Sequence, residues 1–122
     1  MLKRILVVED ESAIRKLLRV NLTARGYEVV EVESAEDGWQ TLQTEEIDAI
    51  VVDLLLPQMS GLDLLRLVEK DGDLAQTPVI ILSALANGLA HEAEKHGNVV
   101  DTILKPMEIS RLVDAVQRAV AG

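Results

Sequence analysis

Short apolar runs alternate along this chain with segments whose apolar residues recur at helical spacing, and this alternation constrains the fold most. Runs of a few Val, Ile and Leu residues are typical of buried strands, whereas spacings of three and four are typical of helices. Strands that alternate with helices favour a parallel sheet covered on both faces. Because such crossovers are right-handed, we predict an α/β fold with a doubly wound, five-stranded parallel sheet.

The predicted elements follow one another without a linker, a repeat or a low-complexity tract. Strands are predicted at residues 4–8, 27–32, 48–53, 77–83 and 100–105. Helices are predicted at residues 12–25, 34–43, 61–70, 86–96 and 108–120. Ser34 and Asp37 have the spacing of a capping box, which predicts a helix that begins after Ser34. In the predicted helix 12–25, apolar residues recur at helical spacing, namely Ile14, Leu17, Leu18 and Leu22. We predict one domain, residues 1–122.

Composition excludes several classes of function. The 122 residues carry a formal net charge of -9, which argues against direct, non-specific nucleic-acid binding. The chain has no cysteine, so disulfides, thiolate metal sites and cysteine catalysis are excluded. No apolar run reaches the roughly 20 residues of a membrane helix, and the N-terminus has no signal-peptide pattern, so no membrane association is expected.

Polar residues suited to metal and phosphate chemistry follow four of the five predicted strands. They are Glu9, Asp10 and Glu11 after the first strand, Asp53 ending the third, Ser83 ending the fourth and Lys105 ending the fifth. Ligands of open α/β sheets bind beyond the carboxyl ends of the strands, so these side chains are expected to converge. Clustered oxygens suit Mg²⁺, and a lysine beside a hydroxyl suits a phosphate group. Asp53 would then be a nucleophile.

Each of these residues also has an ordinary structural explanation. Asp10 and Glu11 could be first-turn acids of the next helix, and Ser83 could be a loop or capping serine. Lys105 could lie on the surface with its stem covering apolar groups. Asp53 is harder to explain in this way, because it interrupts the apolar run of residues 49–56. The joint arrangement therefore favours a site.

Four motifs, in this order, resemble the receiver domain of the response regulators of bacterial two-component signalling. They are ILVVEDE at 5–11, VVDLLLPQMSG at 51–61, VIILSA at 79–84 and LKP at 104–106. The similarity covers about residues 3–119. It implies a flavodoxin-like fold with strand order 2-1-3-4-5 and a cytoplasmic location. It also implies a phosphorylation-controlled switch that catalyses only its own phosphorylation and dephosphorylation.

The resemblance implies a role for each matching residue. Asp53 would accept the phosphoryl group, and Mg²⁺ would be bound by Glu9, Asp10, Asp53 and the backbone carbonyl of Leu55. Lys105 and the switch hydroxyl of Ser83 would each contact a phosphoryl oxygen. Ala84 is small enough to admit the group, and Pro106 would follow a cis peptide bond.

The resemblance also implies partners. The phosphoryl donor would be a histidine kinase or a histidine phosphotransfer protein, and the signal would pass to an unidentified output protein or effector domain. Homodimers could form through the face made by residues 86–96, 100–105 and 108–120.

Some residues depart from the family pattern. Thr102 stands where an aromatic residue is usual, so output could use a different mechanism. Leu55 and Leu85, each two residues beyond a site residue, flank the expected path of attacking water and could slow the loss of phosphate. His91 and His96 are predicted to be solvated surface residues, since five-residue spacing does not place them on one helix face.

Two alternatives remain open. A receiver-like module could bind partners without phosphorylation, and Thr102 favours this weakly. A phosphatase of the aspartyl-phosphate type would need a general acid near Asp53, and Leu55 cannot supply one.

Overall fold

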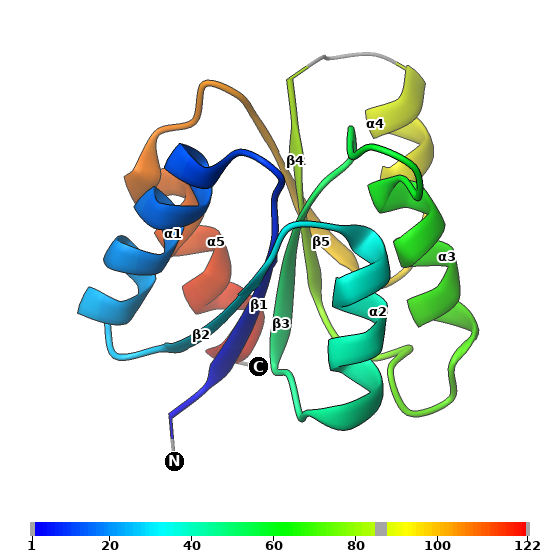
Figure 1. Ribbon diagram of the computed structural model, residues 1–122, viewed down its shortest axis with the longest axis horizontal. Coiled ribbons are helices and arrows are strands. Elements are labelled where there is room, and N and C mark those ends of the chain that lie inside the picture. The colour runs from blue at the N-terminus through cyan, green and yellow to red at the C-terminus, as the bar shows by residue number, and fades with distance from the viewer. Residues whose placement is uncertain (1, 85–87, 122) are drawn as a thin grey trace.

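The computed structural model describes residues 2–84 and 88–121 and contains a five-stranded parallel sheet in the order β2-β1-β3-β4-β5 (Figure 1). The strands are β1 (Arg4–Val8), β2 (Glu28–Val32), β3 (Ala49–Asp53), β4 (Val79–Ser83) and β5 (Val99–Leu104). The helices are α1 (Ser12–Ala24), α2 (Ala35–Thr44), α3 (Gly61–Lys70), α4 (Gly88–Glu94) and α5 (Ile109–Ala121). The predicted fold class and strand order are confirmed.

Helices cover both faces of the sheet: α1 and α5 lie on one side, and α2, α3 and α4 lie on the other (Figure 1). Successive side chains of a strand point to opposite faces. Accordingly, Ile5 and Val7 pack in the cluster beneath α1 and α5, whereas Leu6 and Val8 pack in the cluster beneath α2 and α3. The central strands are buried on both faces, which explains their nearly continuous apolar sequence.

The first helix, α1, does not bury every apolar residue that recurs at helical spacing. Leu18 and Leu22 are fully buried, but Leu17 is 45% exposed. Neighbouring helical residues are about 100° apart around the axis, so Leu17 points away when Leu18 faces the sheet. Leu17 therefore supports the helical spacing of the sequence without belonging to the core.

The helix caps also differ from the prediction in one respect. Ser34 caps α2 by accepting a hydrogen bond from the Asp37 backbone N–H at 3.1 Å, but it lacks the reciprocal bond of a capping box. A complete capping box instead begins α3, where Ser60 and Asp63 exchange two bonds of 3.1 Å. This cap fixes the start of the helix that follows the loop after β3.

β1 and α3 have the predicted bounds, and the boundaries of the other elements shift by one or two residues. For example, β4 begins at Val79, because Pro78 has no backbone N–H for the strand ladder. The predicted helix 86–96 is observed as α4, Gly88–Glu94, and residues 85–87 lie outside the described part. Among the described residues, no helix is long and apolar enough to cross a membrane.

Candidate functional site

Strand alternation brings three charged side chains to the carboxyl edge of the sheet. In β1, β3 and β5, residues Val7, Val51 and Ile103 face the cluster beneath α1 and α5. Two positions later in each case come Glu9, Asp53 and Lys105, which continue the same alternation. The three residues therefore lie on one side of the sheet and reach one another, as the sequence predicted.

Lys105 lies between the two buried carboxylates. Its Nζ is 2.7 Å from Asp53 Oδ2, and 3.0 and 3.1 Å from Glu9 Oε1 and Oε2. Glu9 is fully buried and Asp53 is 4% exposed. The Leu55 backbone N–H donates to Asp53 Oδ1 at 3.0 Å, so all four carboxylate oxygens accept a hydrogen bond. Buried charges are tolerated when paired and hydrogen-bonded in this way.

Burial and crowding change the acidity of this cluster. Burial raises the pKa of Glu9 from 4.5 to about 7, with a further contribution from the Asp53 charge and an opposing one from Lys105. Burial alone would lower the pKa of Lys105, but its hydrogen bonds to Asp53 and Glu9 raise it overall. The pocket thus keeps its ammonium charged and holds an excess of carboxylate.

The carboxylates form a group that fits a hard cation. Glu9, Asp10 and Asp53 each offer an oxygen, and these oxygens lie within 4.8 Å of one another. Asp10 is exposed, whereas the other two are buried, so the group opens to solvent on one side. An all-oxygen set of this kind suits Mg²⁺, which also retains water ligands. The predicted Leu55 ligand lies beside this group, joined to Asp53 through its backbone N–H.

The other predicted phosphate-pocket residues surround the ends of β4 and β5. Ser83 is 2% exposed, and its backbone carbonyl accepts a hydrogen bond from the Lys105 N–H at 2.8 Å. Ala84 follows and is exposed. The peptide bond between Lys105 and Pro106 is cis, as the resemblance implied. Leu85 lies outside the described residues.

Thr102 lies on the face of the sheet that α4 covers. It pairs with Ile81 in the sheet register, while Ser83 pairs with Leu104, so Thr102 and Ser83 share this face. Its Oγ1 is buried and has no hydrogen-bond partner. A polar atom in this condition is unusual and marks a locally unsatisfied part of the structure.

Sequence reasoning missed two residues that shape the site through the backbone. Gly61 packs so closely that an added Cβ would lie 2.3 Å from the Asp53 carbonyl oxygen. Arg15 donates from Nη1 to the Glu9 carbonyl oxygen at 2.9 Å. Gly61 ends the VVDLLLPQMSG motif, but no pattern in the neighbouring sequence shows how closely it packs against Asp53. Arg15 has no distinguishing signal in the sequence.

The prediction of two solvated histidines is half correct. His91 is exposed, but the His96 side chain is only 17% exposed and its Nδ1 contacts Glu69 Oε2 of α3. Glu69 lies in α3 and His96 in the turn after α4, so the two are far apart in sequence and helical spacing could not reveal this contact.

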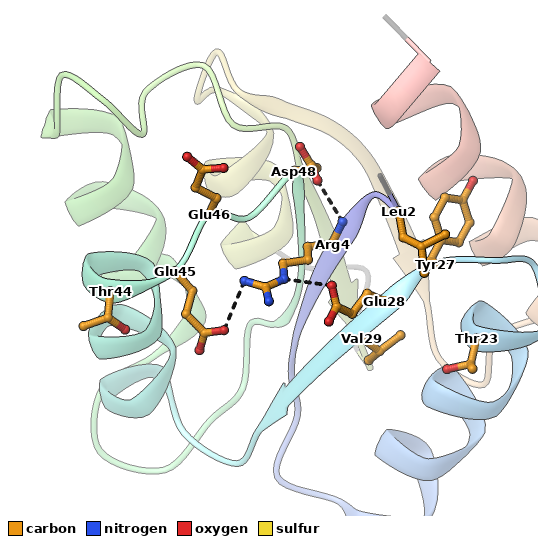
Figure 2. Close-up of a pocket in the computed structure, with 10 residues that line it drawn as sticks. All are labelled: Leu2, Arg4, Thr23, Tyr27, Glu28, Val29, Thr44, Glu45, Glu46 and Asp48. Carbon is orange, nitrogen blue, oxygen red and sulfur yellow. Dashed lines mark hydrogen bonds and ion pairs between the residues drawn. The ribbon is translucent and has the colours of Figure 1, made fainter.

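A hollow of about 720 Å³ lies at the opposite, amino edge of the sheet (Figure 2). In it, Arg4 bridges Glu28 at 3.0 Å and Glu45 at 3.2 Å, and its backbone N–H donates to Asp48 at 2.8 Å. These bonds tie β1 to β2 and to the segment between α2 and β3. The hollow contains none of the residues predicted for phosphate or metal chemistry, so the carboxyl edge is the candidate site.

The sequence profile of the response regulator receiver domain matches residues 5–117. This chain belongs to that family. It is a receiver domain of the two-component response regulators, as its motifs indicated.

Individual relatives agree with this assignment. The chain is 33% identical over 116 residues to the transcriptional regulatory protein AfsQ1 of Streptomyces coelicolor, covering 95% of this chain and 50% of the relative. It is 29% identical over 117 residues to the polar-differentiation response regulator DivK of Brucella ovis, covering 96% of this chain and 95% of the relative. The chain therefore spans about half the length of AfsQ1 and nearly all of DivK.

Solved structures show the same receiver fold. The receiver domain of the Francisella response regulator 1452 superposes with a TM-score of 0.88 at 27% identity, covering 98% of this chain and 97% of that one. A response regulator receiver protein from Pseudomonas putida gives a TM-score of 0.89 at 28% identity, with 97% and 98% coverage.

Proposed function

We propose that this receiver domain is a phosphorylation-controlled switch in which Asp53 accepts the phosphoryl group. The observation that carries the proposal is the buried cluster in which Lys105 Nζ lies 2.7 Å from Asp53 and 3.0 Å from Glu9. A carboxylate and an ammonium held at the carboxyl edge of a parallel sheet suit a nucleophile and a charge-neutralising partner.

Each residue has a part in the proposed transfer. Glu9, Asp10, Asp53 and the Leu55 carbonyl would hold Mg²⁺, which when bound supplies positive charge against the phosphoryl oxygens. An Asp53 oxygen forms the new bond to phosphorus while the bond to the donor breaks, and the electron pair leaves with the donor. Lys105 neutralises one phosphoryl oxygen, Ser83 donates to another, and Ala84 leaves room for the group.

The proposed donor is a phosphohistidine on a histidine kinase or phosphotransfer protein, and the domain later hydrolyses its own acyl phosphate. The added charge at the edge then biases an equilibrium between two conformations. We place this function in one domain, residues 1–122, in the cytoplasm. The signal passes to an output protein or effector domain, and the face of α4, β5 and α5 is the proposed homodimer surface.

A second candidate is a partner-binding module that is never phosphorylated. Thr102 favours it, because this position lacks the aromatic side chain usual in the family. The buried cluster argues against it, since burying two carboxylates and a lysine is costly for a domain without chemistry there.

Intact-mass spectrometry separates the two candidates. The parent and Asp53→Asn are incubated with acetyl phosphate, with Mg²⁺ or with EDTA. The switch predicts one phosphoryl adduct that requires Mg²⁺ and is missing from Asp53→Asn. A folded parent that gains no adduct from acetyl phosphate or from a phosphorylated histidine kinase would support the binding module.

We also propose that Leu55 prolongs the phosphorylated state. Leu55 is 45% exposed and lies two residues beyond Asp53, where its side chain can hinder attacking water. Leu85 is proposed to act in the same way. Leu55→Asn should speed dephosphorylation roughly tenfold, a change of about 1.4 kcal/mol in the barrier. An unchanged rate of adduct loss would exclude this role.

A further inference from the structure

Glu11 is a carboxylate at the site that the proposed transfer does not use. Its Oε1 lies 3.8 Å from Lys105 Nζ, on a side chain that is 63% exposed. It lies outside the group of three carboxylates whose oxygens fit one cation. Because the Glu9 and Asp53 side chains are 0% and 6% exposed, Glu11 stands on the solvent side of Lys105.

The usual structural explanation for an acid at this position does not apply. Glu11 is the N-cap residue of α1, yet its side chain accepts no capping hydrogen bond. Its backbone N–H instead donates to Glu9 Oε1 at 3.4 Å, which holds the residue beside the site. A side chain that faces Lys105 without capping the helix acts mainly through its charge.

The charge of Glu11 adds to the negative charge at the entrance of the site, meaning the solvent-exposed side of Lys105. Glu9, Glu11 and Asp53 bring three carboxylates to Lys105. The exposed Asp10 adds a fourth carboxylate beside Glu9 and Asp53. The nearby Arg15 guanidinium is occupied by the Glu9 carbonyl at 2.9 Å and by Glu33 at 3.7 Å. A phosphodonor that reaches Lys105 must therefore pass close to Glu11, and repulsion grows with the donor's negative charge.

We propose that Glu11 is a specificity-determining residue that selects phosphodonors by charge, disfavouring acyl phosphates relative to phosphoramidates. This inference rests on the proposed function of Asp53. Near neutral pH acetyl phosphate is a dianion, whereas phosphoramidate carries a protonated nitrogen and is largely a monoanion. In both reactions an Asp53 oxygen bonds to phosphorus as the old bond breaks. The electron pair leaves on acetate or on ammonia, and ammonia needs no further proton.

The test measures initial rates of phosphoryl-adduct formation at saturating Mg²⁺ with acetyl phosphate and with phosphoramidate. Glu11→Gln should react about threefold faster with acetyl phosphate at low ionic strength, through a lower KM, because one exposed charge is removed from the entrance. The gain should be smaller with phosphoramidate and should shrink in 0.5 M salt, where screening acts over about 4 Å.

Two matched variants control the test. Glu46→Gln removes the same charge at the opposite edge of the sheet, where Glu46 makes no bond to the residues drawn with it (Figure 2), and should leave both rates unchanged. Glu11→Asp keeps the charge and should be phosphorylated at the parent's rates with both donors. If Glu11 acted through the length of its side chain instead, Glu11→Asp would differ from the parent.

The possible results separate the role of Glu11 from the proposed phosphorylation of Asp53. Equal acceleration with both donors, or a Glu11→Gln variant no faster than the parent, would overturn the role of Glu11. A parent that gains no adduct from either donor would overturn the proposed function of Asp53 and the inference together.

Discussion

Among the described residues, buried polar atoms are hydrogen-bonded at the carboxyl edge of β1 and β3, but two of them lack a partner in the region of α4 and β5. At the edge, every carboxylate oxygen of Glu9 and Asp53 accepts a hydrogen bond. Near α4 and β5, Asn98 Oδ1 and Thr102 Oγ1 are buried without a partner. In the first region, which we call the saturated region, the full set of hydrogen bonds holds the side chains in one geometry. In the second, the unsaturated region, rearranging the side chains breaks fewer hydrogen bonds and therefore costs less free energy. This contrast suits a switch with a rigid reaction site and an adaptable output region.

The largest predicted effect comes from disturbing the backbone of the saturated region. Gly61→Ala should lower the free energy of unfolding by about 3 kcal/mol, because its Cβ would lie 2.3 Å from the Asp53 carbonyl oxygen. Urea denaturation measures the change. Gly72→Ala is the matched control, since nothing lies within 4 Å of its added Cβ, and it should stay close to the parent. Equal stabilities for the two variants would show that the loop after β3 is adaptable as well.

The next effect is a pH dependence of stability in EDTA. The pKa of Glu9 is about 7 in the folded chain, above its ordinary 4.5, so the folded state binds this proton more tightly than the unfolded state does. The resulting stabilisation is complete below pH 4.5 and is lost as the pH rises through about 7. Over this range the parent should lose about 2 kcal/mol more than Glu9→Gln in denaturant titrations. Parallel pH profiles would contradict the prediction.

The smallest predicted effect tests the unsaturated region. Thr102→Val should raise the free energy of unfolding by about 1 kcal/mol, because it removes a buried hydroxyl that has no partner. Thr102→Ser keeps the hydroxyl and should not be stabilised. Thermal unfolding of both variants measures the difference. If Thr102→Val were less stable than the parent, the Thr102 hydroxyl would have a hydrogen-bond partner in solution. The two regions would then not differ in the hydrogen bonding of their buried polar atoms.

Strand alternation explains why so much of the reaction site could be predicted. A residue at the end of a buried strand has its face fixed by the residues before it, so Glu9, Asp53 and Lys105 could be placed together. The capping box of α3, formed by Ser60 and Asp63, is likewise a local pattern that can be read from the sequence. Contacts between separate elements have no such local rule. The Glu69–His96 contact joins α3 to the turn after α4, so it depends on tertiary packing and has no signal in the sequence.

The measurement that tests the central claim most directly is chemical mapping of the phosphorylated residue. The domain is phosphorylated in Mg²⁺, the acyl phosphate is reduced with borohydride, and the peptides are sequenced by tandem mass spectrometry. Reduction of an aspartyl phosphate yields homoserine, and the account predicts homoserine at position 53 and at no other carboxylate. Homoserine at position 10, or a phosphoryl adduct on a side chain other than a carboxylate, would contradict it.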